Sequence, residues 1–501
     1  MMKKNEYDFS VPTRQSYIAI VMILFKTVNV VVRQIFPAIL VILIGGSKNK
    51  GQYIIWALVV GSVISMMYSI INFFRTHFII QNNEIILHTG VFTRKKISVP
   101  FERIQTINFE QNILHQFFSV LRIKLDTAGS EKNEFEFHAI EADKAYALRE
   151  LIMAEKQNIV SKTKESNTLI EAASDATGPY QMIMSISPTQ LLKVGLTENH
   201  IKSGGLILLF FFWIYQNLQE VGVDVDEYSD EIPEWEVGFY VVLALVTFFL
   251  VVSVLISLVR TLISHYDLKL LRSGTGFKIE SGLFTKKEVS ALDHKIQHIS
   301  WSDNLLKRWM GFKDLALNQA SSNEVNAKSN IKIPGCSVQH IRQVTETLFG
   351  QKDFENNITL QSIDKRYFLR FAVMTFLLLS LVCTGLIIAG QYDKIIVAVL
   401  LYLYFCGTRY MNYKKLQFGT NDDMIYIRGG VFGDKAEVMP MFKIQSVEMH
   451  QSPYQTRNQL ASITLYTASG KLRIPYIHQN TCIELMDLLL YKSESDKRKW
   501  M

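Results

Sequence analysis

The chain has 501 residues, 49% of them hydrophobic, and its formal net charge at pH 7 is +7. This length exceeds what one ordinary hydrophobic core supports, so several units are expected. The mild excess of positive charge suits a protein at an anionic membrane surface and makes nucleic acid the weaker expectation as a partner.

The N-terminal part of the chain predicts a polar cytoplasmic segment, 1–16, followed by a membrane hairpin, 17–75. The second half of this hairpin is the clearer one, because 53–74 carries no charged residue over 22 positions and can cross a bilayer. In the first half, Lys26 and Arg33 lie on one side of an apolar helix, which is typical of an interfacial segment. No cleavage site of small residues follows, which argues against a removable signal peptide.

The first β-rich domain is expected over 76–157. Short runs of β-branched residues flank a turn at Asn82-Asn83, and 121–125 alternates strictly between apolar and polar residues, as a half-buried strand does. Residues 141–157 repeat apolar side chains at helical spacing and predict a closing helix.

The same succession of a hairpin and a β-rich domain is expected twice more. The stretch 238–259 carries no charge over 22 residues, and 371–389 and 395–406 are apolar on either side of a short turn. Polar linkers separate the modules. The predicted boundaries are 158–187 for a linker, 188–260 for the second hairpin, 261–350 for the second domain, 351–364 for a linker, 365–413 for the third hairpin, 414–491 for the third domain and 492–501 for a polar tail.

An internal repeat underlies this division. From the glycine at position 90, 282 or 430, an Ile-Gln pair follows at the same distance in all three copies without a gap, and a basic residue precedes each pair. We expect the three isoleucines in the core. Each Gln amide is expected to bind backbone groups at a bend, because a buried amide needs partners, with a contact surface as the alternative. The repeat-core residues are Gly90, Ile104, Gln105, Gly282, Ile296, Gln297, Gly430, Ile444 and Gln445.

Basic residues predict which side of the membrane the domains occupy. Arg75, Arg260 and a cluster around Arg409 stand where the hairpins end, whereas 220–236, in the loop of the second hairpin, carries eight carboxylates and no base. The enrichment of Lys and Arg in cytoplasmic loops therefore places all three β-rich domains in the cytoplasm and the short loops outside.

The repeat resembles the bacterial membrane-anchored pleckstrin-homology-like family (the bPH2, YdbS/YdbT type). The resemblance rests on the Gly-Val/Leu-Phe turn, the basic-Ile-Gln core and the Thr/Gln-Ala-Gly/Ser step after the alternating strand, and it covers nearly the whole chain. It implies an α+β membrane protein of three tandem modules. Each module would be a transmembrane helical hairpin followed by a PH-like β-sandwich of seven strands that a C-terminal helix closes at one end.

The resemblance also implies partners. Three-module members of this family work beside a smaller one-module member, so a smaller bPH2 membrane protein or self-association is expected, besides the membrane itself. The second copy departs most from the pattern, since Ala291-Leu292-Asp293-His294 replaces the Val-Pro-Phe-Glu of the first.

The basic residues of the repeat are the candidate contacts for lipid or a protein partner. They follow the glycine turn or precede the Ile-Gln pair, and each base near an anionic surface contributes about 1 kcal/mol of attraction. A solvated face that keeps the domain soluble is the more frequent role of such bases. The candidates are Arg94, Lys95, Lys96, Arg103, Lys286, Lys287, Lys295, Lys435 and Lys443.

Nothing in the sequence predicts an enzyme, a cofactor or a metal site. Walker A, His-Glu-x-x-His and Gly-x-Ser-x-Gly motifs are missing, the four cysteines form no Cys-x-x-Cys pair, and the eleven histidines are scattered. Coupled carriers usually place Asp, Glu or His inside their spans, and the four apolar stretches named above hold none.

We therefore expect a non-enzymatic, multi-pass protein of the cell membrane with three cytoplasmic PH-like domains. It would serve as a scaffold or interaction module at the inner surface, for example in envelope stress or tolerance of antimicrobial peptides. Two alternatives stay open, a component of an export or transport complex and a sensor of anionic lipid.

Overall fold

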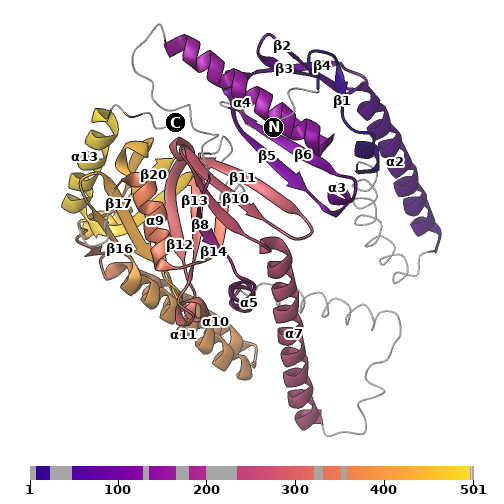
Figure 1. Ribbon diagram of the computed structural model, residues 1–501. Coiled ribbons are helices and arrows are strands. Elements are labelled where there is room, and N and C mark those ends of the chain that lie inside the picture. Colours follow the sequence, from indigo (N-terminus) through magenta and orange to yellow (C-terminus); the bar gives the residue numbers. More distant parts are fainter. Residues whose placement is uncertain are drawn as a thin grey trace. The chain divides into compact units, whose positions relative to one another are not determined.

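The computed structural model (Figure 1) describes residues 7–22, 48–127, 135–164, 180–198, 234–320, 331–350, 358–496 and 498. The predicted acidic loop and the predicted interfacial residues Lys26 and Arg33 lie outside these ranges. The chain divides into two compact units, 1–290 and 291–501.

The secondary structure follows one order three times. A short strand precedes the membrane helices, three strands follow them, and three further strands and a C-terminal helix complete the module. The first module contains β1 (Thr13–Arg14), α2 (Lys48–Arg75), β2 (His77–Gln81), β3 (Glu84–Thr89), β4 (Lys95–Pro100), β5 (Ile104–Gln111), α3 (Ile113–Phe117), β6 (Val120–Thr127), β7 (Phe135–Glu141) and α4 (Ala142–Lys164). The second contains β8 (Gln181–Ser185), α5 (Pro188–Leu196), α7 (Glu234–His265), β9 (Lys269–Ser273), β10 (Gly276–Ser281), β11 (Lys286–Leu292), β12 (Ile296–Ser302), α8 (Leu305–Trp309), β13 (Lys313–Gln319), β14 (Ile331–Cys336) and α9 (Val338–Phe349). The third contains β15 (Gln361–Ser362), α10 (Arg366–Ile388), α11 (Asp393–Lys415), β16 (Gln417–Thr420), β17 (Met424–Gly429), β18 (Lys435–Pro440), β19 (Ser446–His450), α12 (Pro453–Arg457), β20 (Leu460–Thr467), β21 (Gly470–His478) and α13 (Gln479–Ser495).

The sheets cross the boundaries between modules. In the first unit β1 to β4 form one antiparallel sheet, and the second sheet has the order β7-β6-β5-β11-β10-β9-β8. In the second unit the order is β14-β13-β12-β18-β17-β16-β15, and β19-β20-β21 stand as a separate sheet. Each module contributes seven described strands, but one of them precedes the membrane helices and six follow, whereas all seven were expected to follow. The expected self-contained sandwich is corrected, however, because the last three strands of one module continue into the first four of the next.

Two strand pairs make these junctions between modules. In the first junction β11 pairs with β5, with Lys287 opposite Glu110 and Glu288 opposite Phe109. In the second junction β18 pairs with β12 over four residue pairs. Both are antiparallel, and the backbone hydrogen bonds of a ladder couple neighbouring modules along the sheet.

Each module has a short strand that precedes its membrane helices and pairs with the strand that follows them. These pairs are β1 with β2, β8 with β9 and β15 with β16, all antiparallel. The predicted linkers 158–187 and 351–364 contain β8 and β15, and the predicted polar segment 1–16 contains β1, so these predictions are wrong for the three strands. These strands are short and mostly polar, so their sequences resemble those of linkers. Their pairing with β2, β9 and β16 is what identifies them as strands.

Among the described residues, three helices are long and apolar enough to cross a membrane: Val246–His265 within α7, α10 and α11. A shorter apolar helix, Val60–Arg75, ends α2. Helices α10 and α11 lie side by side in Figure 1, and the rings of Phe376 and Tyr402 meet with centroids 6.1 Å apart.

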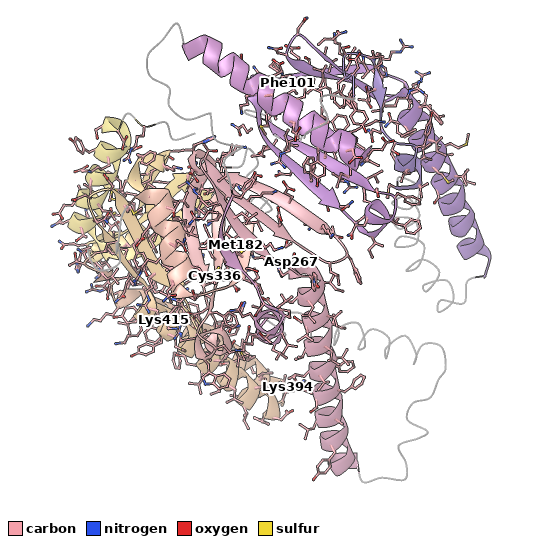
Figure 2. The ribbon with its side chains drawn as sticks, viewed as in Figure 1. Phe101, Met182, Asp267, Cys336, Lys394 and Lys415 are labelled. Carbon is pink, nitrogen blue, oxygen red and sulfur yellow. The ribbon has the colours of Figure 1, made fainter. Side chains whose placement is uncertain are left out.

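The cores of the first and third modules lie between the two strand groups of each module and under its C-terminal helix. In the first module Phe78, Phe101 and Phe137 are fully buried, together with Leu148 and Ile152 of α4; Phe101 is labelled in Figure 2. In the third module α13 contributes to the equivalent cluster. Each such side chain stabilises the fold by about 1.5–3 kcal/mol, and this burial explains the apolar alternation seen in the sequence.

The glycines that begin the repeat are required by the backbone. Gly90, Gly282 and Gly430 have φ of 109°, 109° and 126°, a region that residues with a Cβ avoid. A Cβ at any of the three would also collide with the carbonyl oxygen three residues later. The invariance of this glycine among the three copies therefore follows from the shape of one turn.

Candidate functional site

The three glycine turns lie against the ends of the membrane helices. In the first module Arg75, which ends α2, donates to the carbonyl of Val91 (3.0 Å). In the second, the backbone amide of Leu283 donates to the carbonyl of Ile263 in α7 (2.9 Å). In the third, Lys415 donates to the carbonyl of Gly433 (2.8 Å). Each turn is thus fixed at the end of its domain that adjoins the apolar helix.

Figure 2 labels Lys394 and Lys415, which lie at or beside the opposite ends of α11. Lys415 marks the end that meets the strands, and its ammonium group lies 3.1 Å from a carboxylate oxygen of Asp434. Burial acts to raise the pKa of Asp434, but hydrogen bonds from Lys415 and Arg428 outweigh it and leave that pKa below its ordinary value. The turn is therefore held to the helix by a charged pair as well as by the chain.

Exposed aromatic and basic side chains combine at these turns. Phe92, Phe284 and Phe432 occupy the same position of the repeat and are 92%, 46% and 45% exposed. The bases that follow them in the sequence are also exposed, namely Arg94, Lys95, Lys96, Lys286, Lys287 and Lys435. An exposed phenyl ring beside bases, at the end of an apolar helix, is the combination that favours the interface between lipid and water.

A short helix of the preceding module contacts the turn at the first junction. The side-chain amide of Gln116 in α3 donates to the carbonyls of Leu283 and Phe284 (3.3 and 3.1 Å). On the same helix Phe117 is 80% exposed. The junction therefore presents apolar side chains from two modules on one end of the sheet.

Charge holds the equivalent contact at the second junction. Arg308 of α8 bridges Asp303 and Asp434 with nitrogen–oxygen distances of 3.0 and 2.8 Å. The backbone amide of Asp303 donates to the carbonyl of Asp434 (2.9 Å), and the amide of Asp434 donates to the Asp303 carboxylate (2.8 Å). Trp309 at the end of α8 is 82% exposed, and its counterpart Phe117 is exposed to a similar extent.

An ion pair also joins β11 to the C-terminal helix of the first module. Glu288 on β11 lies 2.6 Å from a guanidinium nitrogen of Arg149, on α4 of the first module, and 2.9 Å from Lys278. Its side chain is 16% exposed, so salt screens this pair less than an ion pair in open solvent.

Two of the predicted basic contacts lie in the interior instead. Lys295 and Lys443 are 7% and 5% exposed, so they cannot form the expected lipid-facing surface. The ammonium group of Lys443 donates to the backbone carbonyls of Asp293 (3.3 Å), His294 (3.1 Å) and Ile296. It joins the third module to the connection between β11 and β12 of the second, and burial lowers its pKa to about 8. Arg103, the remaining candidate before an Ile-Gln pair, is exposed.

The Ile-Gln pairs share a backbone position but not one environment. The three isoleucines are buried, as predicted. Gln105 and Gln297 lie where the strand register shifts, which is a β-bulge. Gln297 is fully buried and donates to the carbonyl of Lys295 (3.4 Å), whereas Gln445 is exposed. The expected role of the amide at a bend therefore holds for Gln297 and not for Gln445.

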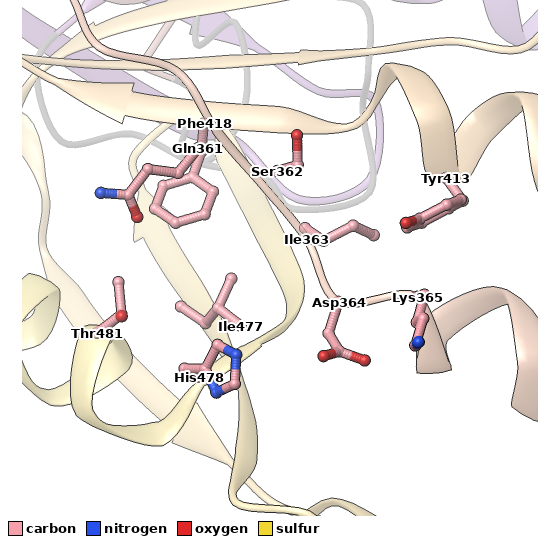
Figure 3. A pocket seen from close by; sticks show the side chains of 10 residues that line it. All are labelled: Gln361, Ser362, Ile363, Asp364, Lys365, Tyr413, Phe418, Ile477, His478 and Thr481. Carbon is pink, nitrogen blue, oxygen red and sulfur yellow. The ribbon is translucent and has the colours of Figure 1, made fainter.

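Figure 3 shows a pocket of about 310 Å³ beside β15, lined among others by Asp364, Phe418 and His478. Asp364 uses a carboxylate oxygen to accept from the amide of Arg366, the first residue of α10 (2.8 Å). In the described part of the chain, no group of three or more His, Cys, Asp or Glu residues could hold a metal ion.

The sequence patterns did not identify the phenylalanine of each turn, or the short helices α3 and α8, as parts of a site. The phenylalanine was visible only as part of the Gly-Val/Leu-Phe pattern. Its exposure depends on the positive φ of the glycine before it, and the contact with α3 or α8 depends on strand pairing between modules. A pattern within one module carries no signal of that pairing.

Comparisons with known proteins agree with the threefold repeat. A family model described as "Bacterial PH domain" matches residues 24–156, 218–352 and 373–493. The UPF0699 transmembrane protein YdbT of Bacillus subtilis (strain 168) is 22% identical over 472 residues, which cover 92% of this chain and 94% of that protein.

Proposed function

The chain belongs to the bacterial PH domain family and is a membrane protein, and from this premise we propose that it is a non-enzymatic scaffold. Its three PH-like modules would bind protein partners at the inner surface of the cell membrane. The observation that carries this proposal is the pairing of β5 with β11 and of β12 with β18. Strand pairing joins neighbouring modules into a connected array, which suits a platform better than three independent ligand-binding domains.

The proposed topology is one helical hairpin for each module. The strand before each set of membrane helices pairs with the strand after it. This pairing supports a topology in which both ends of each helical segment lie at one side of the membrane and the chain between them crosses an even number of times. Bases such as Arg75, Arg260 and Arg409 at the helix ends support a cytoplasmic location for the domains.

The scaffold predicts a stable complex. We expect the tagged protein, extracted in mild detergent after crosslinking in its native membrane, to elute well above the mass of one chain. A smaller member of the same family is the partner that we expect to identify by mass spectrometry. A tagged membrane protein of unrelated fold, expressed at the same level, serves as the control. Recovery of this protein only as an isolated monomer would contradict the scaffold.

A second function, contact with anionic lipid, is favoured by the turns. Phe92, Phe284 and Phe432 are exposed next to bases at the ends of apolar helices. Charged lipid headgroups attract the bases, and the rings gain by leaving water. This contact would orient the modules against the membrane and is compatible with the scaffold.

Lipid contact predicts a position-dependent probe signal. We expect an environment-sensitive fluorophore on Phe92→Cys, in full-length protein in nanodiscs, to shift to shorter wavelength and to be quenched by brominated lipid. Asn83→Cys is the matched control, because Asn83 lies in the turn at the other end of β3. Anionic lipid should strengthen the signal at Phe92 and leave Asn83 unchanged. Equal quenching at the two positions would rule out the turn as the lipid contact.

A further inference from the structure

Two strands, β4 in the first module and β19 in the third, lie at the edge of a sheet, although the equivalent strands of the other modules pair with a strand on both sides. Within the described residues β4 pairs with β3, and β19 pairs with β20, and each stands at the edge of its sheet. The counterparts of β4 are β11 and β18, and the counterparts of β19 are β5 and β12. All four pair across a junction between modules.

The two junctions use one register. Counted from the glycine that begins each repeat, Lys287 (282 + 5) faces Glu110 (90 + 20) at the first junction. At the second, Lys435 (430 + 5) faces Ser302 (282 + 20). The next pairs, Glu288 with Phe109 and Ala436 with Trp301, are positions 6 and 19 in both cases. Two sequences that differ at these positions therefore pair in the same way, which shows that the register belongs to the repeat itself.

The edge strands are more exposed than their paired counterparts. Phe109 and Trp301 are 4% and 5% exposed, whereas Met449, at the same position on β19, is half-buried. On the other side of a junction, Phe92 is 92% exposed against 46% and 45% for its counterparts. In the described residues, β4 and β19 are thus the two junction-type strands that have no neighbouring module to pair with.

The lysines on β4 do not exclude a neighbouring strand. Charged side chains on an edge strand commonly prevent pairing, and Lys95 and Lys96 are exposed. Their equivalents on β11, however, include the exposed Lys287, which lies opposite Glu110 in a formed junction. On β19, Glu448 and His450 are exposed. In the register of the junctions Lys95 would face His450, and the carboxylate of Glu448, two residues away, would lie within diagonal reach of that lysine.

From these observations we infer that β4 of one copy pairs antiparallel with β19 of a second copy of this chain, in the register of the two junctions. Lys95 then faces His450, and Lys96 faces Met449. The inference rests on the proposed scaffold and adds a second copy of this chain to its expected partners. The contact joins unlike surfaces, so it generates rows or rings of copies in the membrane.

Mixed disulfide formation tests this pairing in the full-length protein. One tagged copy carries Lys95→Cys and a second, differently tagged copy carries His450→Cys, both with Cys383 and Cys406 replaced by Ala. The two are co-expressed, and the membranes are oxidised mildly. We expect a product of twice the chain mass that carries both tags, because facing residues of paired strands have Cα separations suited to a disulfide. Both substituted side chains are exposed, which limits damage to the fold.

Two controls define the outcome. Lys96→Cys combined with His450→Cys shifts the register by one residue and points the two side chains to opposite faces, so its yield should fall at least tenfold. Glu110→Cys with Lys287→Cys on one chain reproduces the first junction and should form an internal disulfide. Equal yields for Lys95 and Lys96, or no mixed product while the internal disulfide forms, would overturn the inference. A disulfide only within one chain that carries both Lys95→Cys and His450→Cys would overturn it as well.

The result is separable from the test of the scaffold. Loss of the mixed product with unchanged capture of a partner would remove this inference alone. A mixed product without any captured partner would remove the proposed binding of other proteins and leave the pairing of copies in place.

Discussion

Replacing Gly433 with alanine is expected to open the second junction and to destabilise it by about 3 kcal/mol. A Cβ at this position would collide with the carbonyl oxygen of Asp303, and it would lie 2.7 Å from the carbonyl carbon of Asp303 and 3.0 Å from the Cα of Asn304. All of these are backbone atoms, so no side-chain rotation relieves the contact. The two hydrogen bonds between Asp303 and Asp434 would be lost as the turn moves away.

Hydrogen exchange followed by mass spectrometry measures this opening in the full-length protein. We expect amides of β12 and β18 to exchange about a hundredfold faster, which corresponds to about 3 kcal/mol of local opening. Amides of β2 to β7 in the first unit should keep their protection. Gly407→Ala in α11 is the matched control, since a Cβ there meets nothing within 4 Å. Unchanged exchange in β12 and β18 would show that the junction tolerates a Cβ.

The requirement for glycine at position 433 could not be predicted from the sequence. The equivalent residues of the other two copies are Thr93 and Thr285, so the repeat taken alone predicts that a β-branched residue is tolerated there. The close approach arises from Asp303, which precedes Gly433 by 130 residues. Spacing within one module cannot reveal a contact made by the module before it.

Local elements could be predicted because their causes are local. The turn at Asn82-Asn83, where both residues have positive φ, and the strand 121–125 were confirmed. Ser337 caps α9, and serine at this position is a local signal for the start of a helix. The family resemblance and the membrane location were also confirmed, since they rest on a pattern repeated three times. Pairing of one module with the next was missed, because edge strands carry the same alternation whether or not a neighbour joins them.

The predicted surface of bases was only partly correct, for a related physical reason. The bases after each glycine are exposed, whereas Lys295 and Lys443 are buried. A lysine ordinarily avoids the interior, so the sequence favoured exposure for all nine candidates. Lys443 is buried because the second module supplies three backbone carbonyls to its ammonium group. The sequence identifies Lys443 as a positive charge, but its backbone carbonyl partners can be identified only from the fold.

Removal of the Lys443 ammonium group is expected to destabilise the second junction at pH 7. Lys443→Met keeps most of the side-chain volume but leaves three carbonyls without this donor, one in a buried and two in part-buried contacts, and a buried carbonyl left unpaired costs about 1–3 kcal/mol. Burial of the charge opposes this: the pKa of Lys443 falls from 10.5 to about 8, so charging it costs about 3 kcal/mol more in the folded state. We expect the lost hydrogen bonds to prevail, with a net destabilisation of about 3 kcal/mol.

The same shift in pKa predicts how stability changes with pH. Below about pH 8 Lys443 is charged in both the folded and the unfolded state, so the full cost of burying the charge is present. Between pH 8 and 10.5 the folded protein binds fewer protons than the unfolded chain, so stability rises with pH. The gain approaches about 3 kcal/mol and is specific to this side chain.

Urea unfolding in mild detergent, followed by tryptophan fluorescence between pH 7 and 10, measures both effects. The free energy of unfolding of the wild-type protein minus that of Lys443→Met isolates Lys443, because every other titrating group is common to the two proteins. This difference should be positive at pH 7 and should increase above pH 8. Lys435→Met is the matched control, since Lys435 is exposed on the neighbouring strand, and it should show neither effect. A difference that is flat with pH would mean that Lys443 is solvated and that its three carbonyl contacts do not hold the second and third modules together.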